Sequence, residues 1–242
     1  MSYYTIICKI GGKILEDLEN IQSTISQLSQ LIENNIVTRI ILIPGGGTYA
    51  NFVRELYDAL DLDEDLAHWM GIISMDHNGR DLKKKFPELT LIDDFNKLVE
   101  FTKGISVFLP FKFLRKTDEL PHKWDVTSDS ITLYLAKMMK LEKCYLIKNV
   151  DGIYNESMKI IRKINTQEVE ALKKARNLAK TTNNIDRLKM SSEPIDNYLT
   201  YLIELYNIPC FIINGNADTR RIFDFFDKSL EKEDRVYTKI VF

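Results

Sequence analysis

Two hydrophobic patterns alternate along the chain. In one, short runs of β-branched and other apolar residues end at glycine or polar residues, which predicts buried strands. In the other, apolar residues recur every three or four positions, which predicts amphipathic helices. The predicted strands cover residues 3–8, 36–43, 89–92, 105–109, 143–148, 210–213 and 236–241. The predicted helices cover residues 14–31, 49–60, 66–85, 129–140, 166–175, 195–206 and 217–226, with a short one between 92 and 105.

The alternation of strands with helices predicts an α/β fold, with a mainly parallel sheet and helices on both of its faces. Residues 110–123 are mixed in character and rich in turn formers, so we expect loops or hairpins there. Residues 180–194 contain neighbouring asparagines and few apolar residues, which favours a loop. No linker is evident, and we place a boundary between two lobes of one sheet near Asp125, giving residues 1–125 and 126–242.

Composition and charge argue against two classes of binding partner, nucleic acids and membranes. The 242 residues carry 33 Lys and Arg against 35 Asp and Glu, a net charge of −2, whereas nucleic-acid-binding proteins usually have a strong basic excess. No apolar run approaches the roughly 20 residues of a membrane span, and no leader pattern is seen. We therefore expect a cytoplasmic protein without nucleic-acid or membrane partners. The three cysteines form no C-x-x-C pair and the three histidines lack ligand spacing, so we assign no metal site.

Three predicted strands end in glycine motifs that could bind phosphate. Lys9-Ile10-Gly11-Gly12 closes the first strand, Gly45-Gly46-Gly47 closes the second, and Asn149-Val150-Asp151-Gly152 follows the strand at 143–148. Backbone amides at such turns and at helix N-termini bind anions. In a parallel sheet, ligands bind beyond the carboxyl ends of the strands, where these motifs lie. The pattern predicts a nucleotide facing a second anionic group.

Lys9 is the first candidate catalytic residue. A lysine at the end of a strand that runs into two glycines can place its ammonium group on a phosphoryl group held by the loop amides. Phosphoryl transfer depends mainly on positioning and charge neutralisation. The competing interpretation is a surface lysine at a strand end, which the other motifs make less attractive.

The Gly45-Gly46-Gly47 loop is the candidate acceptor site, together with Gly12 and Asn51. Three consecutive glycines before a helix allow a ligand to approach the backbone closely. A tight turn between strand and helix is the alternative.

Two further segments are candidates for nucleotide binding. Thr127, Ser128 and Asp129 precede or begin a helix, so they could cap it, and Asp129 could also hold a lysine ammonium near the transferring phosphate. The segment after the strand at 143–148 could contact a nucleotide through Asp151 and Tyr154, or could be an ordinary Asp-Gly turn.

The order of these motifs resembles the amino acid kinase family, whose members transfer the γ-phosphate of ATP to a carboxylate, carbamate or phosphate. The resemblance rests on K-x-G-G, G-G-G, S-D and V-D-G-I-Y segments and covers essentially the whole chain. It implies a three-layer α/β/α sandwich, an N-terminal acceptor lobe, a C-terminal nucleotide lobe, ATP with Mg²⁺, and commonly a homodimer. It also implies catalytic roles for Lys9 and Asp129. The nucleotide contacts that it implies, together with our own candidates, are Gly11, Thr127, Ser128, Lys148, Asn149, Asp151, Gly152 and Tyr154.

Within the family, the sequence is most similar to an archaeal branch that converts a furan-bearing phosphate monoester into its diphosphate. The similarity lies in residues 44–51, 124–130, 195–196, 214–215, 220–221 and 237–240. Family members that phosphorylate carboxylates usually carry a second lysine in a G-G-M-x-x-K segment. Residues 190–194 occupy that region without it, and Lys148 is our candidate for the second charge.

The acceptor stays open at this point. The sequence favours a small phosphate monoester, and the alternatives are isopentenyl phosphate, a nucleoside monophosphate or a carboxylate. A nucleotide-binding sensor or storage protein that has lost transfer activity is the alternative outside the enzymes.

Overall fold

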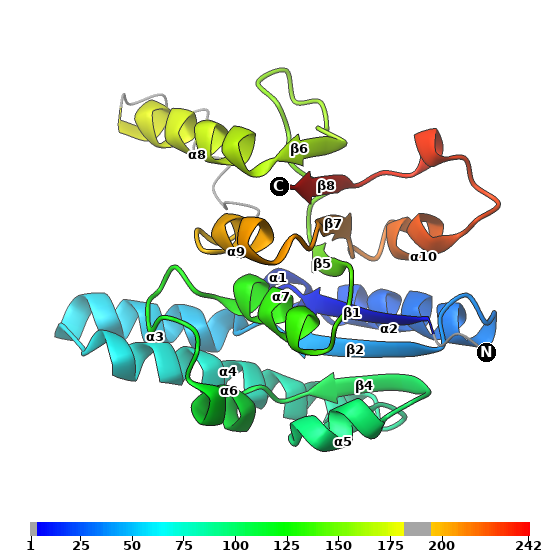
Figure 1. Ribbon diagram of the computed structural model, residues 1–242, viewed down its shortest axis with the longest axis horizontal. Helices are drawn as coiled ribbons and strands as arrows, with labels where there is room; N and C mark the ends of the chain where they lie inside the picture. Colours follow the sequence, from blue (N-terminus) through cyan, green and yellow to red (C-terminus); the bar gives the residue numbers. More distant parts are fainter. Residues whose placement is uncertain (1–3, 182–194) are drawn as a thin grey trace.

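One mixed sheet organises the protein. The computed structural model describes residues 4–181 and 195–242, and the described strands follow the order β3-β4-β2-β1-β5-β7-β8-β6 (Figure 1). Neighbouring strands are parallel except β7 and β8, which are antiparallel. The strands are β1 (Thr5–Ile10), β2 (Arg39–Pro44), β3 (Thr90–Ile92), β4 (Gly104–Phe108), β5 (Cys144–Lys148), β6 (Lys163–Asn165), β7 (Cys210–Asn214) and β8 (Thr238–Val241).

Helices cover both faces of the sheet, so two hydrophobic cores form. One core lies between the sheet and the layer that includes α4, α6, α7 and α9. The other lies between the sheet and α1, α2 and α10. The helices are α1 (Gly12–Leu15), α2 (Leu18–Glu33), α3 (Gly47–Leu60), α4 (Glu64–Lys85), α5 (Phe95–Glu100), α6 (Phe111–Thr117), α7 (Ser128–Met138), α8 (Thr166–Thr181), α9 (Leu199–Tyr206), α10 (Arg221–Phe226) and the 3₁₀ turn η2 (Lys232–Asp234). The predicted α/β/α sandwich is confirmed.

Several predicted elements differ from the structure. The helix predicted over 14–31 is two helices, because Asp17 adopts an extended backbone and accepts a hydrogen bond of 2.9 Å from the Asn20 N–H, which starts α2. The loops predicted over 110–123 are wrong for α6, which buries Phe113 and Leu114. The strand β6 was not predicted, because its sequence Lys-Ile-Asn contains a single apolar residue, and most of the loop predicted over 180–194 lies outside the described residues.

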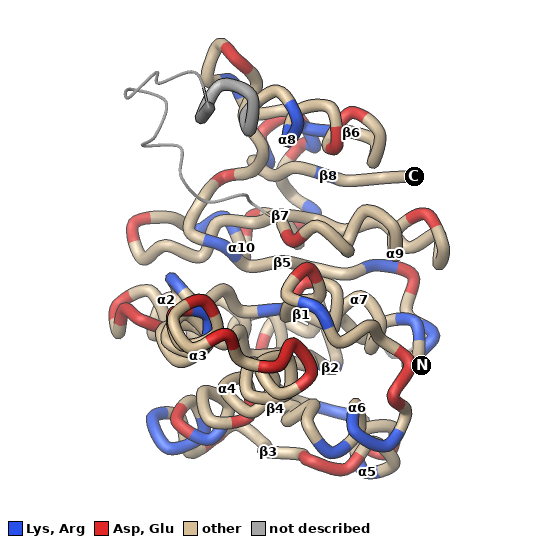
Figure 2. Tube along the Cα trace, turned by 90° about the vertical axis from the view of Figure 1, so that its left-hand side faces the viewer, with Lys and Arg blue, Asp and Glu red and all other residues tan. Residues whose placement is uncertain are grey.

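Charges lie mainly on the outer helices and loops. Figure 2 shows Lys and Arg interspersed with Asp and Glu rather than gathered in one stripe. No helix in the described part of the chain combines the length and apolar character needed to cross a membrane. The sheet continues from β1 to β5 across the predicted lobe boundary, and the division into two lobes stays a prediction.

Two glycine loops pack against each other above β1 and β2. The Gly45 N–H donates a hydrogen bond of 2.8 Å to the Ile10 carbonyl, which extends the ladder between the strands. Gly47 adopts a left-handed conformation with φ of 54°. A Cβ on Gly12 would lie 2.7 Å from the Gly47 Cα, so this close approach requires glycine.

We expect Gly12→Ala to destabilise the protein by about 1–3 kcal/mol, because the new methyl group meets backbone that cannot move without separating the two loops. Gly71→Ala is the matched control. The Cβ added there would meet only the Trp124 ring, at 3.7 Å, and alanine in a helix interior should stabilise by about 0.5–1 kcal/mol. Urea unfolding of both variants measures the difference, and equal stabilities would show that the loops are not tightly packed.

Candidate active site

The pleat of two neighbouring strands points two lysines to the same face of the sheet. Side chains alternate along a strand, so Lys9 shares a face with Ile7 in the core beneath α7. On β5, Lys148 follows Cys144 and Leu146 onto that same face. The strands are parallel and adjacent, with Lys9 paired to Leu146, so both ammonium groups emerge at the carboxyl edge of the sheet.

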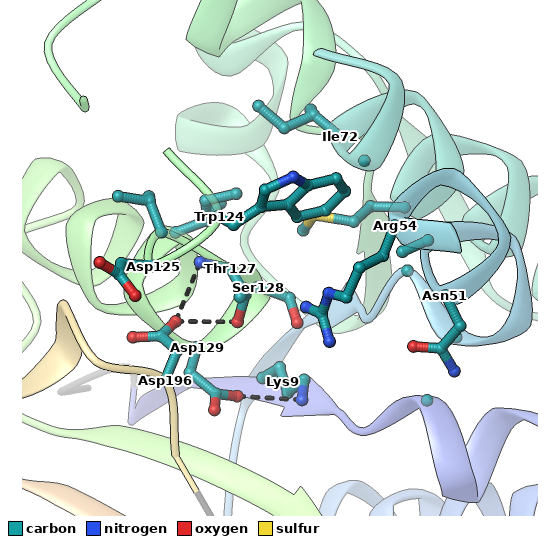
Figure 3. A pocket seen from close by; sticks show the side chains of 18 of the residues that line it. Lys9, Asn51, Arg54, Ile72, Trp124, Asp125, Thr127, Ser128, Asp129 and Asp196 are labelled. Carbon is teal, nitrogen blue, oxygen red and sulfur yellow. Dashed lines mark hydrogen bonds and ion pairs between the residues drawn. The ribbon is translucent and has the colours of Figure 1, made fainter. Parts of the chain in front are cut away.

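Asp129 lies between these lysines. It occupies the first turn of α7, and its carboxylate accepts Lys9 Nζ at 2.9 Å and Lys148 Nζ at 2.8 and 2.6 Å. The pair of Lys9 and Asp129 appears as a dashed line in Figure 3. Lys9 is 6% exposed and Asp129 is 2% exposed. One buried carboxylate therefore connects β1, β5 and α7.

The electrostatics of this trio favour the ionised form of its carboxyl group. Burial opposes ionisation of Asp129, but the positive charges of Lys148 and Lys9 outweigh it and lower the carboxyl pKa to about 2. Burial lowers the pKa of Lys9 to about 8, with Asp129 opposing the shift and Lys148 reinforcing it. Two lysines against one carboxylate give the trio an excess of one positive formal charge.

Asp196 holds the start of α7 in place. Its carboxylate accepts five hydrogen bonds, two from Thr127, two from Ser130 and one from the Leu199 N–H, at 2.6–3.0 Å. Figure 3 shows it directly beneath the Thr127 end of the helix. Burial and the nearby Asp129 charge raise the Asp196 pKa, while the hydrogen bonds counteract the shift. Asp196 thus joins the N-termini of α7 and α9 and positions Asp129.

A cavity of about 620 Å³ opens above the trio. The glycine loops, α3, α4, residues 124–129 and residues 195–197 surround it, so both predicted lobes contribute. The sequence-predicted site residues that line it are Lys9, Gly12, Gly46, Gly47, Asn51, Thr127, Ser128, Asp129 and Lys148.

The other predicted residues lie outside the lining of this cavity. The backbone groups of Gly11 and Gly45 form hydrogen bonds within the protein. The Gly11 N–H donates to the Ile147 carbonyl at 2.8 Å, and the Gly45 carbonyl accepts a hydrogen bond from the Asn78 side-chain amide at 2.7 Å. Their ligand contacts stay predictions.

The segment after β5 forms a cross-linked turn. Asp151 Oδ1 accepts hydrogen bonds from Asn214 at 3.1 Å and Arg221 at 3.2 Å, and the Asn149 carbonyl accepts the Asn216 amide at 3.4 Å. A Cβ on Gly152 would lie 2.2 Å from Thr238 Oγ1, and Gly152 has φ of 154°. Tyr154 forms an antiparallel bridge with Ile160. The turn is rigid, and its nucleotide contacts stay predictions.

Sequence reasoning missed Arg54 and the role of Asp196. Arg54 lines the cavity from α3, seven residues beyond the glycine triplet, where no motif marks it. Asp196 was noticed only as part of a family similarity, because its partners at the start of α7, Ser130 and Thr127, lie 66 and 69 residues away in the chain. From the sequence, His68 was considered only as one of the three histidines that lack ligand spacing. It is 5% exposed, stacks on His122 at 4.9 Å and also borders the cavity.

A comparison with models of known protein families shows which family the chain belongs to. Residues 4–214 match the model of the Amino acid kinase family. The chain belongs to the amino acid kinase family. The predicted family is confirmed, and with it the predicted enzyme class, a kinase with ATP as the phosphate donor.

Individual relatives agree with this family. The (5-(aminomethyl)furan-3-yl)methyl phosphate kinase of Methanocaldococcus jannaschii is 28% identical over 242 residues, covering 97% of this chain and 97% of that protein. Uridylate kinase from Archaeoglobus fulgidus superposes with a TM-score of 0.65 at 16% identity, covering 98% of this chain and 100% of that chain. UMP kinase from Ureaplasma parvum gives 0.64 at 18% identity, with 99% of each chain covered. The two solved structures show the shared fold.

In this amino acid kinase, we expect Asp129→Asn to destabilise the fold by about 3–5 kcal/mol at pH 7, because the buried ammonium group of Lys9 and the half-buried one of Lys148 lose their counter-charge. The Asp129 pKa is lowered in the folded state from 3.8 to about 2. Its stabilising contribution is therefore present above pH 4 and is lost as the pH falls through 2. That pH-dependent part, about 2 kcal/mol, should disappear in the variant.

Asp81→Asn is the control, because its pair with Lys85 is exposed at the surface. We expect that variant to lose less than about 1 kcal/mol. Urea unfolding between pH 2 and 7 compares the two variants with the unmodified protein. Equal effects of the two substitutions would mean that Asp129 does not neutralise the lysines.

Proposed function

We propose that this protein transfers the γ-phosphoryl group of ATP to the phosphate of a small phosphate monoester, forming a diphosphate. The observation that carries the proposal is the Lys9–Asp129–Lys148 trio at the base of a cavity bordered by both glycine loops and the start of α7. The name of the relative from Methanocaldococcus jannaschii, a kinase of a phosphate monoester, supports this acceptor class.

The trio suits phosphoryl transfer because its lysines supply positive charge, although it offers no general base. An oxygen of the acceptor phosphate attacks the γ-phosphorus as the bond to the β,γ-bridging oxygen breaks, and ADP leaves. Lys9 and Lys148 would neutralise the charge on the transferring group, and Asp129 would hold both ammonium groups in place. With a pKa of about 2 and both oxygens bound to lysines, Asp129 is not a general base.

Among the described residues around the cavity, the buried acidic and imidazole side chains are poor bases, which favours an acceptor that is already ionised. Asp196 has both carboxylate oxygens in hydrogen bonds. His68 is buried, and burial lowers its pKa to about 4, which makes it a weak proton acceptor. A phosphate or carboxylate oxygen needs no deprotonation near neutral pH, whereas an alcohol does. This argues for phosphate over hydroxyl acceptors.

Lys148 would replace the lysine that other family members carry on a G-G-M-x-x-K segment. It reaches the same carboxylate as Lys9, from the end of the neighbouring strand. The nucleotide would extend from this point toward the turn that contains Asn149, Asp151 and Tyr154.

The family implies Mg²⁺. In the described residues, no group of three or more His, Cys, Asp or Glu side chains forms a cage for a metal. Mg²⁺ commonly binds through substrate phosphates and waters with few protein ligands, and we expect it to enter with ATP. The homodimer and the cytoplasmic location stay predictions.

The proposed function is tested by measuring ADP release from ATP and Mg²⁺ with a panel of acceptors. The panel contains alkyl and aryl phosphate monoesters, isopentenyl phosphate, UMP and carboxylates. We expect stimulation by monoesters and a diphosphate product in the mass spectrum. Tight ATP binding with no stimulated ADP release would favour a nucleotide sensor, and stimulation by carboxylates alone would overturn the proposed acceptor class.

We expect Lys9→Ala and Lys148→Met each to lower turnover by at least about 100-fold, because each removes positive charge from the transition state. Lys143→Met is the matched control: this exposed residue precedes β5, whereas Lys148 ends it, and turnover should stay within about twofold. Steady-state kinetics with the best acceptor, together with thermal melts, separate lost catalysis from lost folding. Near-native turnover of Lys148→Met would leave Lys9 as the main positive charge.

A further inference from the structure

We propose that Arg54 binds the phosphate of the acceptor and that Trp124 with the α4 wall holds a compact aromatic or apolar body beside it. This inference rests on the proposed function and names the acceptor class more closely. It assigns a binding role to a residue outside every sequence motif of the site.

The first argument is charge balance within the cavity. Its charged lining residues are Lys9, Lys13, Arg54, Lys148, Glu16, Asp125, Asp129 and Asp196. Lys13 pairs with Glu16 at 3.0 Å, and the other two lysines share Asp129. Among the described residues, Arg54 has no hydrogen bond or ion pair. It is therefore the cation lining this cavity that no carboxylate of the described residues neutralises.

The second argument is the position of the guanidinium group. Arg54 projects from α3, and its Cζ lies 5.2 Å from the centroid of the Trp124 ring. Figure 3 shows the guanidinium directed into the cavity, between Trp124 above and Lys9 below. The Trp124 ring is itself braced by Tyr57, edge to face at 5.7 Å. A phosphate in this space would meet Arg54 on one side and the trio on the other.

The third argument is the wall next to Arg54. Ile72 and Met75 of α4, with Val126, give the cavity an apolar side next to the Trp124 ring. Gly71 leaves room there, since even an added Cβ would only touch the indole ring at 3.7 Å. An aromatic ring placed against this wall would gain both apolar burial and contact with Trp124. The wall thus favours a compact ring or branched alkyl group attached to the phosphate.

Guanidinium recognises phosphate through two parallel hydrogen bonds, which a lysine cannot reproduce. Arg54 would accordingly control acceptor binding rather than ATP binding. If Arg54 had a purely structural role and only stacked on Trp124, removing its charge would weaken the binding of neither the acceptor nor ATP.

The test uses benzyl phosphate as a probe with a ring and methyl phosphate as a probe without one. Isothermal titration calorimetry is run on the full chain with each probe and with a non-hydrolysable ATP analogue. For Arg54→Gln we expect the Kd of both phosphate probes to rise about 10- to 100-fold, while the Kd of the ATP analogue changes less than about threefold. Arg54→Lys should recover part of the loss.

Two variants serve as comparisons. Arg115→Gln removes another arginine that stacks on a tryptophan, since its Cζ lies 4.6 Å from the Trp69 ring, but it does not line the cavity. It should bind all ligands as the unmodified protein does. Trp124→Leu should weaken benzyl phosphate more than methyl phosphate, because it removes the ring contact and leaves the guanidinium.

The outcomes separate this inference from the proposed function. Unchanged phosphate binding by Arg54→Gln, equal weakening of the ATP analogue, or no binding of benzyl phosphate by the unmodified protein would each overturn it. Binding that depends on Arg54 without any phosphoryl transfer would support the acceptor site and contradict the kinase proposal instead. Thermal melts confirm that each variant is folded, which the exposed position of Arg54 on α3 favours.

Discussion

A buried carboxylate between two ammonium groups is the constraint on which this site depends. Removing charges from water is costly, and the contacts of Asp129 with Lys9 and Lys148 offset that cost. Their contacts connect β1, β5 and α7, elements that are far apart in the sequence. The same contacts leave one excess positive charge at the carboxyl edge of the sheet. The arrangement that stabilises the fold would therefore also attract the anionic ligands of the proposed function.

Sheet topology explains why this arrangement forms where it does. β1 is central, with β2 on one side and β5 on the other, and all three strands are parallel. The chain passes from β1 to β2 on one side and later to β5 on the other, so the strand order reverses at β1. α/β proteins bind ligands in the crevice beyond such a point. The loop after β1 packs on the loop after β2 through Gly12 and Gly47, while Asp196 fixes the start of α7 opposite. Several rigid elements thus hold the site.

The parts of the site that depend on neighbouring residues could be predicted from the sequence, and the parts that depend on tertiary contacts could not. Lys9, the glycine loops and the start of α7 were predictable, because strand ends, glycines and helix caps depend on neighbouring residues. Lys148 could be suggested as a second charge, but its contact with Asp129 requires the register of β1 with β5. Arg54 and the hydrogen bonds of Asp196 depend on how α3 and α9 approach the cavity. The α6 helix was missed because its short apolar pattern resembles that of a turn-rich loop.

Lys148 lies at the end of a strand, which limits how far its positive charge can move. A lysine on a helix that begins in a loop can approach or leave the phosphates as that loop moves. Lys9 and Lys148 instead emerge from adjacent strands whose backbones are hydrogen-bonded together, and their ammonium groups already share a carboxylate before any ligand binds. Preorganised charge needs little rearrangement at the moment of reaction. On the proposed function, the strands would supply the charge for the chemical step, and α3 with residues 124–126 would select the acceptor.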